Sequence, residues 1–134
     1  MKGGVAKMKA YYGKIEKLTK DNNFFRQVLW TGKYCQLVVM SLKPGEEIGL
    51  EVHDKVDQFF RVEEGEAKFI INGEEYAAKD GDAVIVPAGA QHNVVSTGSE
   101  DLKLYTIYSP ANHPDGTVHK TKQQALEAEE HEQH

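Results

Sequence analysis

The sequence predicts an all-β domain, a sandwich or a barrel of short strands, with one helix near its C-terminus. Three observations indicate this class. Short segments rich in β-branched and apolar residues recur along most of the chain. Glycine-containing turn signals separate these segments at short intervals. A helical pattern is convincing only near the end, whereas a parallel α/β sheet would alternate strands with helices.

The expected elements follow one another in a simple order. Residues 1–10 have no useful periodicity and are expected to be partly flexible. Residues 11–33 are mixed in character and contain the turn signal Asp21-Asn22-Asn23. The strand pattern begins at Tyr34 and ends at Ser109. The expected strands are Tyr34–Lys43, Gln58–Glu63, Ala67–Ile71, Glu75–Lys79, Ala83–Val86, Asn93–Ser96 and Leu102–Ser109.

Two local signals are the most specific. Asn72-Gly73 lies between two strand segments, and both residues tolerate the positive φ that a type I′ hairpin turn requires. Thr121–Glu130 is rich in helix-forming residues. Thr121 and Gln124 have the spacing of a capping box, so this segment is expected to be the helix.

The pattern has no internal repeat and no linker, so we expect one domain with three parts. Residues 1–33 would form an N-terminal segment packed on a barrel of residues 34–110. Residues 111–134 would form a turn followed by a helical or disordered tail. His113 and His119 frame this turn, which either folds back over the barrel mouth or lies in solvent.

The composition is that of a soluble globular protein. The chain has 134 residues, of which 40% are hydrophobic and 28% are charged. Its single cysteine, Cys35, excludes an intramolecular disulfide framework and a cysteine-based zinc finger. No apolar run approaches the ~20 residues of a membrane span, and no apolar segment follows the first lysines. We therefore expect a cytoplasmic protein without a membrane partner.

The charge is unevenly distributed along the chain. Residues 1–43 contain 9 Lys or Arg and 2 acidic residues, whereas residues 44–134 contain 7 and 19. The net charge of −5 argues against general affinity for nucleic acid. The basic segment either binds an anionic partner or pairs with the acidic remainder, within the chain or across a dimer. We favour pairing, because the interleaved basic and aromatic residues of RNA-binding proteins are lacking.

Two histidines within the β-rich region are the candidate metal ligands. Glu51 and His53 are two residues apart, so on a strand they face the same side. Gln58 begins the next strand, and His92 follows the turn at Pro87-Ala88-Gly89. Two imidazoles and one carboxylate from different strands form a facial triad. This donor set suits iron(II), manganese, nickel or zinc and leaves coordination positions open.

The spacing of these residues resembles two motifs of the cupin family. The first motif is Gly, five residues, His-x-His, three or four residues, Glu, six residues, Gly. Its counterparts here are Gly45, Glu51-Val52-His53, Gln58 and Gly65. The second is Gly, five residues, Pro-x-Gly, two residues, His, three residues, Asn. Its counterparts are Gly81, Pro87-Ala88-Gly89, His92 and, in place of Asn, Ser96. The resemblance covers about residues 34–110 and implies a double-sheet jelly roll.

The resemblance also implies a ligand set. In cupins the two histidines and the glutamate of the first motif and the histidine of the second hold the metal. Here Glu51 replaces the first histidine and Gln58 replaces the glutamate. The implied ligands of one divalent transition metal (zinc, manganese, iron or nickel) are Glu51, His53, Gln58 and His92. This set carries one negative charge, as the usual set does.

Two assignments in this set stay open. Asp57 also satisfies the motif spacing and is the alternative to Gln58. Parity favours Gln58, which shares a strand face with Phe60 and Val62. Glu51 is either a ligand or a general base beside a three-ligand metal. We favour the ligand, because a carboxylate next to a cation has a low pKa and is a weak base.

The resemblance implies three possible functions. The first is metal-assisted isomerisation or tautomerisation of a small carbohydrate or keto acid, with the metal as Lewis acid. The second is a non-haem iron dioxygenase, since two histidines and one carboxylate support oxygen activation. The third is a non-enzymatic barrel that binds or senses a small molecule. In each case the partner is a small molecule rather than a nucleic acid, and the resemblance implies a homodimer.

Overall fold

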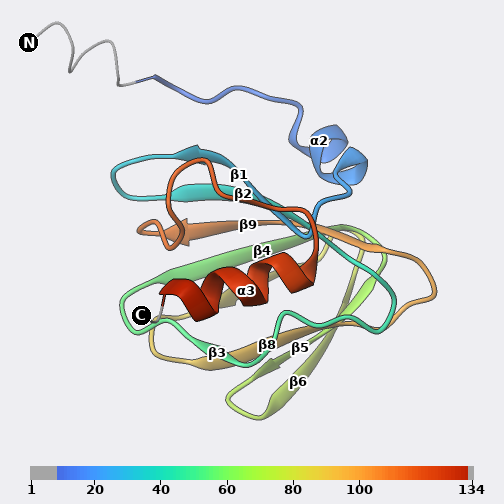
Figure 1. Ribbon diagram of the computed structural model, residues 1–134. Helices are drawn as coiled ribbons and strands as arrows, with labels where there is room; N and C mark the ends of the chain where they lie inside the picture. Colours follow the sequence, from blue (N-terminus) through green and yellow to red (C-terminus); the bar gives the residue numbers. More distant parts are fainter. Residues whose placement is uncertain (1–8, 133–134) are drawn as a thin grey trace, which may run out of the picture.

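The computed structural model describes residues 9–132 and has two antiparallel sheets packed against each other (Figure 1). One sheet has six strands in the order β10-β1-β2-β9-β4-β7, and the other has four in the order β3-β8-β5-β6. The prediction of an all-β jelly roll is confirmed. The expected flexible start falls largely on residues 1–8, which lie outside the described residues.

The elements differ from the predicted ones mainly at the two ends of the chain. In chain order they are α2 (Ile15–Asp21), β1 (Arg26–Thr31), β2 (Gln36–Leu42), β3 (Glu51–Val52), β4 (Asp57–Glu64), β5 (Glu66–Ile71), β6 (Glu74–Lys79), β7 (Ala83–Val86), β8 (Gln91–Ser96), β9 (Leu102–Ser109), β10 (Val118–His119) and α3 (Lys122–Glu132).

The N-terminal segment contains two elements that the sequence pattern did not indicate. The helix α2 has seven residues, and Lys14 at its N-cap makes no capping hydrogen bond. Such a short helix depends on packing rather than propensity, and its Thr19 is fully buried. The strand β1 pairs with β2 and β10. Arg26 occupies a buried position of β1, which interrupts the apolar pattern expected of a strand.

The hairpin prediction at Asn72-Gly73 is confirmed. Asn72 has a φ of 49° and Gly73 a φ of 86°. The pairing of β5 with β6 continues to Ile71 and Glu74, directly beside the turn. The two residues with positive φ match the type I′ geometry, which follows the twist of the paired strands.

The core lies between the sheets and follows the alternation of the strands. In β4, Phe60 and Val62 are buried, and Phe60 packs edge-on against Phe69 of β5, with ring centroids 5.1 Å apart. The motif glycine Gly65 has a φ of +89°, and a Cβ there would lie 2.7 Å from the carbonyl oxygen of Asp101. A side chain at this position is therefore excluded by both backbone conformation and space.

The C-terminal segment returns to the barrel. β10 pairs with β1, and α3 begins after Thr121, whose hydroxyl accepts a hydrogen bond from the Gln124 amide at 3.1 Å. The helix prediction is confirmed, with its end shifted to Glu132. Ala125 of α3 is buried. None of the helices in the described range is both long and apolar enough to span a membrane.

Candidate metal centre

Glu51, His53 and His92 come together at one end of the four-stranded sheet. β3 pairs with β8 so that Glu51 lies directly opposite His92, and His53 follows β3 on the same side as Glu51. The Glu51 Oε1 atom lies 3.5 Å from His53 Nε2 and 3.8 Å from His92 Nε2. One donor atom from each of the three residues lies within 4.8 Å of the others.

These distances fit a shared metal ion. Two ligand atoms that are each about 2.1 Å from a metal lie about 3.0–3.4 Å apart in octahedral or tetrahedral geometry. The observed separations from Glu51, 3.5 and 3.8 Å, exceed the upper end of this range by about 0.1 and 0.4 Å. His53 Nε2 and His92 Nε2 are buried and have no hydrogen-bond partner within the described range. Unsatisfied buried polar atoms are costly, so the two imidazoles are suited to coordination.

The protonation states also suit a metal site. Burial raises the pKa of Glu51, but the contact with His53 and the charges of Arg26 and His92 outweigh burial, so this pKa lies below its ordinary value. Burial lowers the pKa of His92, only partly opposed by the Ala90 carbonyl. An anionic carboxylate and a neutral imidazole are the forms that bind metals. The His92 Nδ1 atom lies 3.3 Å from the Ala90 oxygen, which directs Nε2 towards Glu51.

Gln58 faces the interior, and its neighbour Asp57 does not. The Gln58 side chain is buried and donates from Nε2 to the Thr106 hydroxyl at 3.0 Å. Its Oε1 is buried without a hydrogen-bond partner in the described residues, so it is free to act as a ligand. Asp57 is exposed, and its Oδ1 accepts a hydrogen bond from the Ala88 amide. The assignment of Gln58 as the fourth ligand stays a prediction. The Asp57 carboxylate instead stabilises the turn at Ala88 through this hydrogen bond.

A buried tyrosine and a half-buried histidine lie beside the cluster. The Tyr108 hydroxyl is 3.2 Å from His113 Nε2, and the Tyr108 ring centroid is 6.0 Å from that of His53. Burial raises the pKa of Tyr108 to about 12 and lowers the pKa of His113 to about 3. Both groups are therefore uncharged at neutral pH. The Gln36 amide holds the loop, since its Oε1 accepts from the His113 amide at 3.0 Å and its Nε2 donates to the His113 carbonyl.

His113, at the start of this turn, therefore lies at the barrel mouth, whereas Pro114, Asp115 and Gly116 are exposed to solvent, so each alternative holds for part of the turn. The physical reason is that Gln36, which is fully buried, replaces water as the hydrogen-bond partner of the turn backbone. The strand parity of β9 also places Tyr108 inside, while Tyr105 points to the opposite face.

Arg26 is the site residue that the sequence pattern did not indicate. Its side chain is 5% exposed, and its Nη1 lies 3.2 Å from His119 Nδ1. The available signal was a charged residue directly after Phe24 and Phe25. This signal did not predict a strand, because a charged residue at a buried position breaks the alternation of apolar and polar residues in β1.

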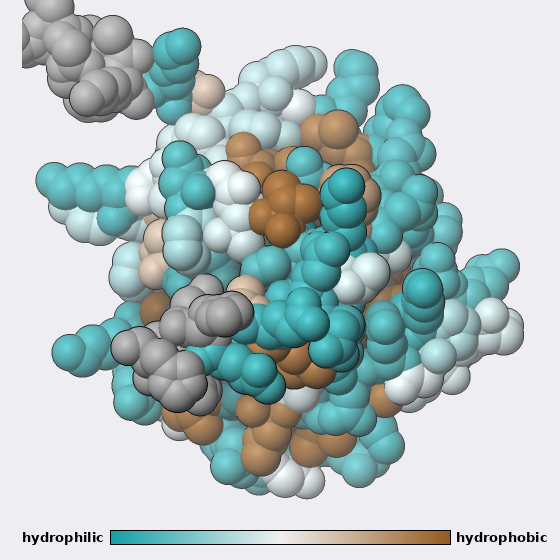
Figure 2. Space-filling model, viewed as in Figure 1, coloured by the Kyte–Doolittle hydropathy of each residue, from teal (hydrophilic) through white to brown (hydrophobic). Residues whose placement is uncertain are grey.

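A cavity of about 170 Å³ is lined by Arg26, Glu51, His53 and His113 together. α3 lies across it, and Figure 1 shows this helix in front of the space between the sheets. Figure 2 shows mostly hydrophilic side chains over the same face. The lining residues are Arg26, Glu51, His53, Asn112, His113, His119, Ala125, Ala128 and Glu129.

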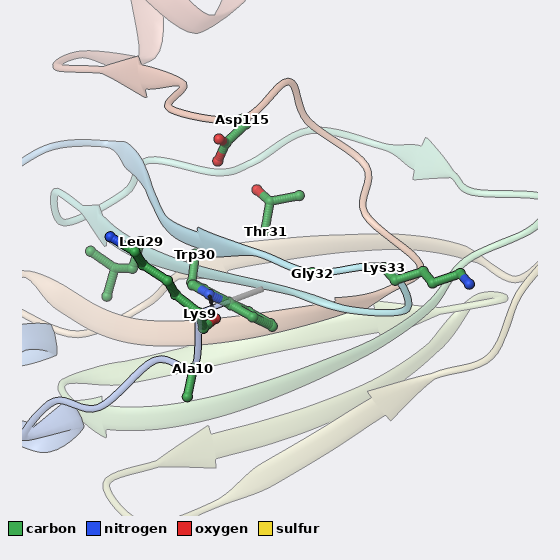
Figure 3. Close-up of a pocket in the computed structure, with 8 residues that line it drawn as sticks. All are labelled: Lys9, Ala10, Leu29, Trp30, Thr31, Gly32, Lys33 and Asp115. Atoms are coloured by element: carbon green, nitrogen blue, oxygen red, sulfur yellow. Dashed lines mark hydrogen bonds between the residues drawn. The ribbon is translucent and has the colours of Figure 1, made fainter. Parts of the chain in front are cut away.

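A larger hollow of about 740 Å³ lies elsewhere, beside Trp30 (Figure 3). Its charged lining residues are Lys9, Lys33 and Asp115, and it contains no histidine. The Trp30 indole donates a hydrogen bond to the Lys9 carbonyl across it. It offers no cluster of metal donors, so the smaller cavity at Glu51 is the candidate site.

Fold and site define a small β-barrel protein with a His/Glu cluster at its mouth, and comparison with known proteins gives its family. The family model described as a cupin domain matches residues 38–108. The chain belongs to the cupin family.

Three relatives illustrate this membership. The protein YrkC of Bacillus subtilis is 49% identical over 129 residues, which is 91% of this chain and 69% of YrkC. The crystal structure of BH2720 from Bacillus halodurans has a TM-score of 0.88 and 43% identity, covering 90% of this chain and 96% of that one. The 5-nitrosalicylic acid 1,2-dioxygenase of a Bradyrhizobium species is 35% identical over 77 residues, 58% of this chain and 35% of the dioxygenase.

Proposed function

We propose that this protein is a metal-dependent enzyme that isomerises or tautomerises a small keto acid or carbohydrate. One observation carries the proposal. Glu51, His53 and His92 present donor atoms within 4.8 Å of one another, and both imidazole Nε2 atoms are buried without a hydrogen-bond partner in residues 9–132. A metal bound there supplies a Lewis acid that polarises a carbonyl oxygen.

The uncharged pair beside the cluster supports proton chemistry rather than binding alone. The Tyr108 hydroxyl lies 3.2 Å from His113 Nε2, and His113 lines the cavity whereas Tyr108 does not. A neutral hydrogen-bond donor in the cavity wall, such as His113, stabilises the oxygen of a carbonyl that gains negative charge when a neighbouring carbon loses its proton. The proton lost by that carbon would pass to the Glu51 carboxylate, in which case His53, Gln58 and His92 would hold the metal and Glu51 would be the general base.

A dioxygenase is the second candidate. Two histidines and one carboxylate with open positions form the donor set of non-haem iron oxygenases. The similarity to the 5-nitrosalicylic acid dioxygenase covers 58% of this chain, and the pairing of Glu51 with His92 lies inside the matched cupin segment. The cavity of about 170 Å³ lies below the ~300–1,000 Å³ of typical ligand pockets, which favours a smaller substrate than a substituted aromatic acid.

The first experiment measures the metal content of tag-free protein by mass spectrometry, with His92→Ala and Asp57→Asn in parallel. We expect about one equivalent of a transition metal in the parent and in Asp57→Asn, because Asp57 is exposed, and none in His92→Ala. No metal in the parent, even after reconstitution, would contradict the proposal and favour a metal-free binding barrel.

The second experiment tests the reaction. Proton NMR in deuterated buffer follows exchange of the methyl protons of pyruvate and of the carbon-bound protons of dihydroxyacetone. Tautomerisation exchanges protons on carbons next to a carbonyl, so metal-loaded protein should accelerate exchange of at least one compound and chelated protein should not. Iron in the site with substrate-dependent oxygen uptake, and no exchange, would favour the dioxygenase instead.

A further inference from the structure

We propose that Arg26 binds the carboxylate of the substrate, so that the site takes small anionic 2-oxo or dicarboxylic acids and not neutral sugars. This inference rests on the proposed metal site and narrows its substrate class. The guanidinium lines the same cavity as Glu51 and His53, and it reaches the cavity from β1, in the other sheet.

The first argument is the unused hydrogen-bonding capacity of Arg26. A guanidinium has five N–H donors. Nη1 contacts His119 Nδ1 and the guanidinium also interacts with the Tyr108 hydroxyl, while Nε is buried and has no hydrogen-bond partner in the described part of the chain. Arg26 also forms no ion pair with a carboxylate among residues 9–132. A buried arginine with free donors is a strong site for a carboxylate, which it binds through two parallel hydrogen bonds.

The second argument is the charge of the cavity. Glu51 is a half-buried carboxylate in the described lining of this cavity, and its negative charge offsets part of the charge of a bound metal. A divalent metal, Arg26 and Glu51 together carry two net positive charges. Buried charges are stable only when they are compensated. Glu129 lines the mouth but is exposed, so it compensates weakly. An anionic ligand supplies the missing charge, whereas a neutral sugar does not.

The third argument is size. The cavity holds about 170 Å³, and α3 limits it through Ala125 and Ala128. A compact acid with a second oxygen near its carboxylate can contact Arg26 and a metal at Glu51 together, because both line this one small space. The chemistry therefore points to acids of a few carbon atoms.

The test uses the metal-loaded full chain and isothermal titration calorimetry with pyruvate, oxalate and malonate. Arg26→Gln should bind the same metal equivalent as the parent and should weaken the best of these acids by about 10- to 100-fold, the loss expected for a charged hydrogen-bonded pair. Neutral pyruvamide should bind the parent and Arg26→Gln equally and weakly. Arg26→Lys, which keeps the charge but loses the planar fork, should give an intermediate affinity.

The chain offers a matched control, because it contains only one other arginine, Arg61. Arg61 points to the opposite face of β4 and lies near Glu63, so Arg61→Gln should bind the acids as the parent does. Thermal unfolding of each variant checks the fold. If Arg26→Gln does not fold, the affinity of Arg26→Lys for the acids tests the proposal instead. An affinity equal to that of the parent in Arg26→Lys overturns the proposal.

The outcomes separate the two proposals. A parent that binds metal but none of the three acids overturns the role of Arg26 and leaves the metal site intact. Equal affinity of the parent and Arg26→Gln for the best acid also overturns the role of Arg26 and leaves the metal site intact. A parent that binds no metal overturns the proposed function and, with it, this inference.

Discussion

Substitution of His113 by glutamine should reduce the acid sensitivity of the metal-free protein between pH 7.5 and 5.5 by about 1.4 kcal/mol. Burial lowers the pKa of His113 from its ordinary value of 6.5 to about 3, so the folded protein keeps this imidazole neutral throughout this range. The unfolded chain protonates it below pH 6.5. The stability contributed by the neutral form is therefore present above pH 6.5 and falls as the pH decreases.

The size of the effect follows from the two pKa values. At pH 5.5 the unfolded histidine is about ten times more often protonated than neutral, which costs the folded state about 1.4 kcal/mol relative to pH 7.5. Glutamine does not titrate, and its amide can keep the hydrogen bond to Tyr108. His92, whose pKa burial also lowers, contributes in the same direction and remains in the variant.

The assay is urea unfolding of EDTA-treated parent and His113→Gln at pH 7.5 and 5.5. We expect the loss of unfolding free energy between these pH values to be smaller in the variant by about 1.4 kcal/mol. An NMR titration of the His113 ring gives an independent reading. Equal losses in the two proteins, or a ring that titrates near pH 6.5 in the folded state, would refute a neutral His113 in the folded protein.

Three further predictions concern the ligands and the core. His53→Ala should bind no metal and still fold, since the core between the sheets does not include this ring. Elemental analysis checks the metal content and circular dichroism checks the fold. One full equivalent of metal in this variant would contradict the proposed site. Gln58→Glu should tighten divalent metal binding by adding a negative charge; unchanged affinity in a competition titration would mean that Oε1 points away from the metal. Phe69→Ala, at 1% exposure, should lower the free energy of unfolding by about 3–5 kcal/mol in urea, and a loss below 1 kcal/mol would contradict its packing.

The barrel could be predicted because its signals are local. The hairpin turn predicted at Asn72-Gly73 requires a positive φ at both residues, and both have one in the structure. Gly65 lies where the chain crosses close to Asp101, so the motif glycine has a steric cause. Strand parity separated Gln58 from Asp57 correctly, because successive side chains of a strand alternate between two faces.

The N-terminal segment could not be predicted in the same way. α2 is too short to be stable alone and has no capping hydrogen bond, so only its packing determines it. β1 carries Arg26 at a buried position, and that charge broke the pattern by which a strand is recognised. Hydrophobic periodicity does not detect a charged residue at a buried strand position.

The sequence by itself determined the class of fold, the two motifs and the candidate donors Glu51, His53, Gln58 and His92, because these depend on spacing along neighbouring strands. Only the tertiary structure decided what surrounds the donors. It placed Arg26 from β1 and His113 from the returning C-terminal segment in the lining of one cavity. The physical reason is that these groups meet through long-range strand pairing and the buried hydrogen bonds of Gln36, which no local pattern encodes.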